Sequence, residues 1–252
     1  MGETGGILPR GDGATIAYRR LDGKNPGVVF LHGFRSDMTG AKALAVEDFC
    51  RRRGHACVRF DMTGHGASSG RFEDGTIGGW ADDAVAVLDA LTEGSQIVVG
   101  SSMGGWLMLL AALARPQRVV GLLGLAAAPD FTETLIFQAL DPEQRQAFER
   151  DGQVLIDDCQ GEAPYPISRR LIEEGRRHLL LSGPIALSCP VRLIHGQQDA
   201  DVPWPTALKL ADCLDATDVA VTLVKSAGHR LSEPDDIARM LTVLDELLAK
   251  AR

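Results

Sequence analysis

One short stretch, residues 97–106, constrains the fold of this chain more than any other; it reads Ile-Val-Val-Gly-Ser-Ser-Met-Gly-Gly-Trp. An apolar, β-branched run leads into Gly-x-Ser-x-Gly, and a helix-like apolar segment at 107–114 follows. Strand, sharp turn and helix form the context in which this motif marks a nucleophile elbow. Because so tight a turn leaves little space for a Cβ two positions from the serine, we expect Gly100 and Gly104 to be sterically required. The sequence predicts that Ser102 is exposed at the carboxyl end of a strand.

Apolar runs alternate with helix-like segments on both sides of this motif. Runs typical of buried strands lie at residues 28–31, 56–60, 97–99, 119–125, 191–196 and 219–224. A weaker run at 15–18 predicts an edge strand. Apolar residues at helical spacing lie at 42–53, 80–91, 107–114, 206–214 and 234–248. This alternation predicts an α/β fold, a mostly parallel sheet of about eight strands with helices on both faces.

The alternation breaks at residues 128–130 and resumes with the run at 191–196. Residues 130–182 are polar and helix-like, and three prolines interrupt them. An insertion between two strands of a sheet is a natural place for a lid over the carboxyl edge, where ligands bind. We therefore expect a single α/β domain over residues 1–252, with a small helical lid at 130–182 inside it.

Composition limits the classes of partner and the cellular compartment that we expect for this chain. The net charge of −8 argues against nucleic acid or an anionic membrane as the main partner. The five cysteines are scattered and form no Cys-x-x-Cys pair, which is typical of free thiols in a reducing compartment. Residues 1–6 lack the features of a secretory signal, and the longest apolar run, 106–114, is too short to span a bilayer. These features predict a cytoplasmic protein without stable membrane insertion.

A serine hydroxyl needs a base, and the base needs an acid that orients it. The sequence offers Ser102, then Asp199, then His229, in the chain order Ser, acid, His. Asp199 and His229 each follow an expected strand, so both belong in loops at the sheet edge that carries Ser102. The three side chains are the predicted catalytic triad.

Two other aspartates compete with Asp199 for the role of the acid. Asp201 lies two residues further on, and Asp130 follows the strand after the elbow. Asp199 is preferred because it precedes a turn of the form Asp-x-x-Val-Pro, from which its side chain can reach back toward His229. Both alternatives stay open at this point.

An oxyanion hole requires two backbone donors that point at one position. Met103, the residue after the nucleophile, is expected to supply one N–H, and Phe34, in the loop after the strand at 28–31, the other. Gly33 allows that loop to approach closely. Trp80 and Trp106 are candidates for the lining of an apolar acyl pocket, although core packing is an equally good interpretation of both.

Three further histidines, His32, His65 and His195, each precede a glycine at the end of an expected strand. We interpret them as structural loop histidines. They form no cluster with metal-ligand spacing, so no metal site is predicted. The glycines around residues 64–66 lack the third glycine and the helix start of a dinucleotide fingerprint, so no cofactor is expected.

At these residues the chain resembles the serine α/β-hydrolase superfamily over nearly its full length. It is more closely similar to a branch that contains a mitochondrial acyl-protein thioesterase, also called mycophenolic acid acyl-glucuronide esterase. The residues behind this second likeness lie at 39–45, 54–61, 99–108 and 195–204. The branch implies hydrolysis of acyl thioesters or esters by Ser102, Asp199 and His229. The chain departs from it in lacking an evident mitochondrial targeting segment and around residues 175–178 of the lid.

The expected function is cleavage of carboxylic esters or acyl thioesters through an acyl-enzyme, with a small acyl compound or an acylated protein as substrate. The same triad could cleave a carbon–carbon bond or an amino-terminal peptide bond, and a catalytically silent ligand-binding protein is the alternative of another class. A peptidase would need a lid carboxylate to hold an ammonium, and the candidates are Glu133, Glu173 and Glu174. Basic lid side chains fit a solvated helix face better than an anionic substrate end; they are Arg169, Arg170, Arg176 and Arg177.

Overall fold

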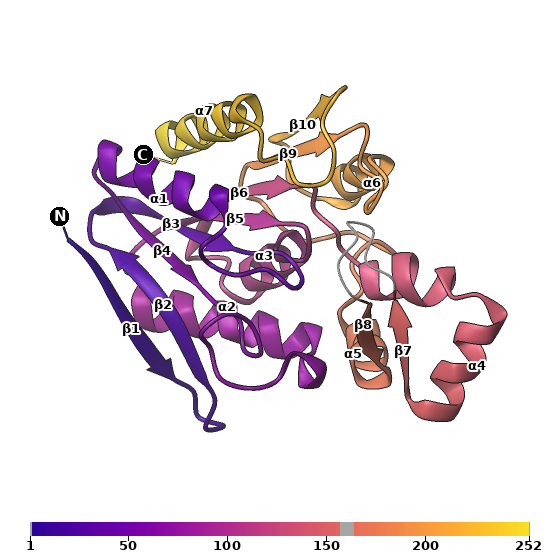
Figure 1. Cartoon of the computed structure of the whole chain (residues 1–252). Helices are drawn as coiled ribbons and strands as arrows, with labels where there is room; N and C mark the ends of the chain where they lie inside the picture. The colour runs from indigo at the N-terminus through magenta and orange to yellow at the C-terminus, as the bar shows by residue number, and fades with distance from the viewer. Residues whose placement is uncertain (1, 157–163, 252) are drawn as a thin grey trace.

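The structure is a computed structural model that describes residues 2–156 and 164–251. In it, the chain folds around an eight-stranded sheet (Figure 1). The strand order is β1-β2-β4-β3-β5-β6-β9-β10. The strands are β1 (Glu3–Pro9), β2 (Thr15–Leu21), β3 (Lys24–Leu31), β4 (His55–Phe60), β5 (Gln96–Ser101), β6 (Val119–Leu125), β9 (Val191–Gly196) and β10 (Val219–Val224). Six neighbouring strands pair in parallel, so their carboxyl ends meet at one edge of the sheet; they are β4, β3, β5, β6, β9 and β10. The predicted mostly parallel α/β sheet is confirmed.

The edge of the sheet differs from the prediction. Strand β2 pairs with β1 on one side and with β4 on the other, both antiparallel, so residues 15–18 do not form an edge strand. The outermost strand on this side of the sheet is β1, whose sequence Glu-Thr-Gly-Gly-Ile-Leu-Pro is largely exposed. A glycine-rich, solvated strand carries no apolar alternation, which is why the sequence pattern missed it.

Helices cover both faces of the sheet (Figure 1). On one face lie α1 (Ala41–Arg53) and α7 (Pro234–Lys250); on the other lie α2 (Ile77–Leu91), α3 (Met103–Ala114) and α6 (Pro205–Cys213). Strand β5 shows how the two cores form. Ile97 and Val99 pack in the core beneath α1 and α7, whereas Val98 packs in the core beneath α2 and α3. The continuous apolar run follows from this burial on both faces.

The insertion, residues 130–182, lies between β6 and β9. Its described elements are η2 (Thr132–Ile136), η3 (Phe137–Ala139), α4 (Pro142–Asp151), β7 (Gln153–Ile156), β8 (Tyr165–Ser168), α5 (Arg169–Gly175) and η4 (Arg176–His178). Strands β7 and β8 form an antiparallel pair, so the insertion is not purely helical as expected. Residues 157–163 of the expected lid, which include Cys159, lie outside the described residues.

Polar contacts tie the end of the insertion to its start and to the sheet domain. The carboxylate of Asp130 accepts hydrogen bonds from the backbone N–H groups of Leu180 (2.8 Å) and Leu181 (2.9 Å). The indole N–H of Trp106 donates to the carbonyl of His178 (3.1 Å). Similarly, the carboxylate of Glu174 accepts from the N–H of Gly78 at the start of α2 (2.9 Å). The insertion is thus held at its base.

Candidate active site

Ser102 occupies a strained turn between β5 and α3. Its φ of 53° and ψ of −117° lie in a region that residues with a Cβ rarely adopt. The turn is fixed because the Ser102 N–H donates to the carbonyl of Leu125 (2.9 Å) and its own carbonyl accepts from the N–H groups of Gly105 (2.8 Å) and Ala128 (3.1 Å). The side chain is therefore presented at the carboxyl edge of the sheet.

The two elbow glycines sit where no Cβ fits. A Cβ on Gly100 would lie 2.2 Å from the carbonyl oxygen of Gly104, and one on Gly104 would lie 2.2 Å from that of Leu31. Both contacts are with backbone, which cannot move aside without opening the turn. This is the crowding expected from the Gly-x-Ser-x-Gly pattern.

The structure brings Ser102, Asp199 and His229 together at this edge. The Ser102 hydroxyl lies 3.0 Å from Nε2 of His229, and Nδ1 of His229 lies 2.8 Å from Oδ2 of Asp199. Because a carboxylate only accepts, Nδ1 carries the imidazole proton and Nε2 is left to accept from the serine. The side chain of Asp199 has no exposed surface, and that of His229 is partly exposed.

Asp199 is held in place by four donors. Its Oδ1 accepts from the backbone N–H groups of Asp201 (3.0 Å) and Val202 (2.8 Å), and its Oδ2 accepts from His229 and from Nε2 of His195 (3.1 Å). Burial alone would raise the pKa of this carboxyl, but the hydrogen bonds from His195 and His229 hold that pKa well below its usual range. Asp199 is therefore an anion at neutral pH.

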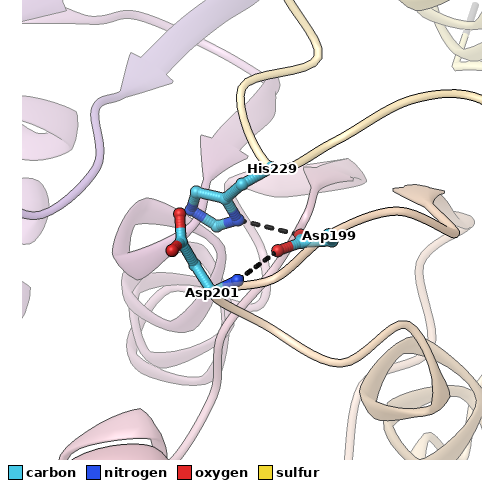
Figure 2. A group of neighbouring side chains, drawn as sticks. All are labelled: Asp199, Asp201 and His229. Carbon is cyan, nitrogen blue, oxygen red and sulfur yellow. Dashed lines mark hydrogen bonds and ion pairs between the residues drawn. The ribbon is translucent and has the colours of Figure 1, made fainter. Parts of the chain in front are cut away.

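The two alternative acids occupy other positions. Asp201 gives a backbone hydrogen bond to Asp199, while its own carboxylate lies beside the ring of His229 and lines the cavity (Figure 2). Asp130, with φ of 62°, binds the amides of Leu180 and Leu181 at the base of the insertion. In the structure, Nδ1 of His229 is bonded to Asp199 and to neither alternative.

Ligand atoms of Asp199, Asp201 and His229 lie within 4.8 Å of one another, a separation that could suit a metal ion. However, both oxygens of Asp199 and both nitrogens of His229 already take part in hydrogen bonds. A metal here would have to break the contacts from Ser102 through His229 to Asp199, so the donor set fits a proton relay better than a metal centre.

The loop after β3 lies against the nucleophile. A Cβ on Gly33 would be 3.4 Å from that of Ser102, so the chain passes very close at this point. Phe34 follows, and its ring packs edge-to-face against the rings of Phe131 and Tyr165 from the insertion. Phe34 and Met103 both line the cavity beside Ser102, and Met103 opens α3, where the first N–H groups have no partner within the helix.

A cavity of about 660 Å³ opens above Ser102 and His229. One wall is apolar and comes mainly from the insertion; it includes Phe131, Leu135, Ile136, Ile156 and Tyr165. Charged lining residues come from the loop after β3, the start of α1 and the loops beside Asp199 and His229; they are Arg35, Asp37, Lys42, Asp201 and Arg230. The guanidinium of Arg35 lies over the ring of Tyr165, 4.3 Å from its centroid, so the charged and apolar parts of the lining meet there. The cavity therefore offers both apolar surface for hydrocarbon and charged side chains for a polar part of a ligand.

Neither predicted pocket tryptophan lines this cavity. Trp80 and Trp106 are both fully buried. Trp80 packs edge-to-face on Phe34 and Trp106 packs edge-to-face on Phe131, with ring centroids 5.9 Å apart in each pair. The two indoles support the residues that form the wall, because each also donates its N–H to a backbone carbonyl that fixes it in the core.

The basic residues singled out in the lid also lie away from the cavity. Arg169 donates to the carbonyls of Phe148 and Glu149, and Arg176 pairs with Glu133. The cations that line the cavity lie outside the insertion, and no sequence pattern pointed to them; they are Arg35, Lys42 and Arg230. The only signal was positional, since Arg35 and Arg230 follow predicted strands and Lys42 begins the predicted helix at 42–53.

Comparisons with known proteins identify the family of the chain. A model described as the alpha/beta hydrolase family matches residues 28–240. The chain belongs to the alpha/beta hydrolase family. This hydrolase is 44% identical over 245 residues to the human palmitoyl-protein thioesterase ABHD10, mitochondrial, covering 97% of this chain and 80% of that protein.

Solved structures of other hydrolases superpose closely. Mouse alpha/beta hydrolase domain-containing protein 10 matches with a TM-score of 0.92 and 41% identity, covering 99% of this chain and 100% of that one. A putative hydrolase from Agrobacterium vitis S4 matches with a TM-score of 0.94 and 37% identity, covering 98% and 100%. Family membership makes this chain an enzyme of the hydrolase class.

The expected cytoplasmic location is wrong. The relatives that are 43–45% identical to this hydrolase are named as mitochondrial proteins. The prediction rested on cysteine usage and on the composition of residues 1–6, and neither feature distinguishes one reducing compartment from another. Within residues 2–156 and 164–251, no helix combines the length and apolar character needed to cross a bilayer.

Proposed function

We propose that this hydrolase cleaves acyl thioesters and carboxylic esters through a covalent acyl-enzyme on Ser102. The observation that carries the proposal is the unbroken chain of hydrogen bonds from Ser102 through His229 to Asp199, at the floor of a cavity with one apolar wall. Relatives that are 43–45% identical and named palmitoyl-protein thioesterases support a thioester as the scissile bond.

In the first step, Nε2 of His229 takes the hydroxyl proton of Ser102 as the serine oxygen attacks the carbonyl carbon. Asp199 holds the required tautomer and stabilises the imidazolium that forms. The N–H groups of Phe34 and Met103 stabilise the oxyanion. When the tetrahedral intermediate collapses, the bond to the leaving group breaks and the leaving thiolate or alkoxide takes the proton from His229.

In the second step, His229 acts as a base toward water. The water oxygen attacks the acyl carbon and its proton passes to Nε2, so that collapse releases the carboxylic acid and returns the proton to Ser102. The insertion lines the cavity beside the reaction centre. Its apolar wall would hold the acyl chain, which fits a long-chain acyl group on a small thiol or on a protein.

The alternative of an amino-terminal peptidase finds little support in the insertion. Glu133 forms an ion pair with Arg176, and Glu174 binds both His178 and the N–H of Gly78. Glu173 is exposed on α5, and none of the three carboxylates lines the cavity, whereas a peptidase needs one that is directed at the ammonium of its substrate.

The proposal is tested by covalent labelling and by turnover. Wild-type enzyme should be labelled by a fluorophosphonate, and Ser102→Ala should abolish the label and lower turnover by on the order of 10⁴-fold. Ser101→Ala is the matched control, because Ser101 is the neighbouring serine and should leave the label in place. Rates on matched oxygen and sulfur esters then measure the preference for thioesters. A loss under tenfold in Ser102→Ala, or an unlabelled wild type, would reject the nucleophile or favour a silent binding protein.

A further inference from the structure

A second histidine lies behind the proposed triad. His195 is the fifth residue of β9, four positions before Asp199, and it is fully buried. Its side chain shares a face of the strand with Val191 and Leu193, which pack in the core beneath α2 and α3. It is absent from the cavity lining, so it cannot touch a substrate bound there.

The contacts of its ring fix the position of its proton. Nε2 of His195 lies 2.9 Å from the carbonyl oxygen of Val202 and 3.1 Å from Oδ2 of Asp199. Because the carbonyl oxygen only accepts, Nε2 must carry a hydrogen. That N–H is shared between the Val202 carbonyl and the same carboxylate oxygen that accepts from His229.

The other ring nitrogen of His195, Nδ1, departs from the rule that buried polar atoms form hydrogen bonds. In the described part of the chain, Nδ1 of His195 is buried without a hydrogen-bond partner. An unpaired polar atom in a core is costly, and a leucine or methionine at this position would avoid the cost. Retention of a histidine here is understandable if its Nε2–H does something that an apolar residue cannot do.

We propose that His195 is a positioning residue for catalysis, which acts by donating a hydrogen bond to Oδ2 of Asp199 and so aims that oxygen at His229. The inference rests on the proposed function, because it assigns His195 a role only through the triad. Val202 completes the arrangement, since its N–H binds one oxygen of Asp199 while its carbonyl orients the histidine that binds the other. The carboxylate is thus clamped on both sides.

Loss of the same contact should also change the pH dependence of activity. A donor on Oδ2 withdraws part of the negative charge that the imidazolium feels. When that donor is lost, the carboxylate attracts the His229 proton more strongly, and the acid limb of the activity profile moves to higher pH. Other charged groups that face this chain of contacts are Asp201 on the same loop, Lys42 from α1, and Arg230 beside His229. None of these is altered by a substitution at position 195.

Two substitutions separate positioning from packing. His195→Asn keeps a polar side chain but is too short to bring a donor to Oδ2, whereas His195→Gln places an amide N–H where Nε2 was. We expect His195→Asn to lower kcat by roughly tenfold or more at a KM within about threefold of wild type, and to raise the acid limb by about half to one pH unit. His195→Gln should restore most of both.

All rates are divided by the concentration of active sites, which is measured as the amount of protein labelled by a fluorophosphonate at completion. Partial unfolding therefore does not mimic a catalytic loss. His55→Gln is the matched control, because His55 is another buried histidine on a strand. It is the first residue of β4 and so lies at the amino end of the strand, away from the proposed triad, where its Nδ1 donates to the carbonyl of Pro26. His55→Gln should change stability without changing the acid limb.

A double-mutant cycle with Asp199→Asn completes the test. If His195 acts through Asp199, then His195→Asn should cost less than about twofold once Asp199 has been replaced. Full additivity of the two losses, or an acid limb that does not move in His195→Asn, would overturn the positioning role. Neither result would touch the proposed function, which fails instead if Ser102→Ala keeps its activity.

Discussion

The carboxyl edge of the sheet and the insertion hold the two halves of the cavity in different ways. At the sheet edge, each proposed catalytic side chain is fixed by the backbone around it: Ser102 by the elbow, and Asp199 by two amides and two histidines. The insertion is held mainly through side chains. Glu174 and Trp106 link it to α2 and α3, Asp130 joins its start to its end, and apolar residues such as Ile172 pack in the core beneath α2 and α3. The proposed reacting groups are therefore fixed by backbone geometry, whereas the apolar wall is held in place by side-chain packing.

This difference predicts that substitutions at the sheet edge change the rate for every substrate, whereas substitutions in the insertion change the choice among substrates. Precise positioning of reacting groups requires a rigid support. A hydrocarbon chain, by contrast, is bound by area and shape, which an inserted segment can adjust without disturbing the reacting atoms.

The largest expected effect separates Asp199 from its neighbour. Asp199→Asn should lower kcat/KM by on the order of 10³- to 10⁴-fold on all acyl lengths, because an amide permits the wrong His229 tautomer. Asp201→Asn should stay within about tenfold, since the Asp201 backbone N–H that binds Asp199 is retained. Steady-state rates on short and long acyl thioesters measure both. The opposite order of the two losses would make Asp201 the acid.

A second prediction tests the apolar wall by comparing two neighbours on β7. Ile156 lines the cavity, while Leu155 points the other way and is 61% exposed. Ile156→Ala should reduce kcat/KM for long acyl chains by roughly tenfold, because lost apolar contact weakens chain binding, and it should leave short chains nearly unchanged. Leu155→Ala should affect neither. A uniform loss over all chain lengths would show that Ile156 supports the reaction centre and not the chain.

A smaller effect is expected at the base of the insertion. Asp130→Asn replaces one of two accepting oxygens with an NH₂ group that faces the N–H of Leu180 or Leu181, so it should cost about 1–2 kcal/mol of unfolding free energy. Asp141→Asn, at the N-cap of α4 in the same insertion, should be nearly neutral because asparagine caps as well as aspartate. Denaturant unfolding measures both, and equal costs would contradict the role given to Asp130.

The arrangement of the sheet could be predicted because each step depends on local sequence. Apolar runs and the elbow motif place Ser102, Asp199 and His229 at strand ends, and a parallel sheet brings such ends to one edge. The position of Gly100 and Gly104 follows from sterics alone. These features need no knowledge of which distant side chains meet.

Other features depend on contacts between segments that no local pattern links. Trp80 and Trp106 have the composition of pocket residues, but whether they lie in the wall or behind it depends on how Phe34 and Phe131 pack. His195 looked like a loop histidine, and its contact with Asp199 depends on how the chain turns after β9. The same holds for Lys42, whose amine donates to the carbonyl of Arg230 beside His229.

The last prediction concerns acid stability at the carboxyl edge of the sheet. Burial lowers the pKa of both His32 and His65 to about 4, from an ordinary value of 6.5. The unfolded chain therefore binds more protons than the folded one between these values, so the contribution of both histidines is complete above pH 6.5 and is lost as the pH falls toward 4. Among the described residues, Nε2 of His65 has no hydrogen-bond partner, whereas Nε2 of His32 accepts from the N–H of Met62.

His65→Phe should therefore be close to neutral at pH 7 and should flatten the fall in unfolding free energy between pH 6.5 and 4.5. The ring lies among Phe72 and Trp80, so a phenyl group fits the same apolar surroundings. His32→Phe removes the same titration but also leaves the Met62 N–H unpaired, so it should cost about 1–3 kcal/mol at every pH. Urea unfolding midpoints measured from pH 7 to 4.5 distinguish the two variants. If the unfolding free energy of His65→Phe falls with pH as steeply as that of the wild type, the acid sensitivity belongs to other groups, away from the carboxyl edge of the sheet.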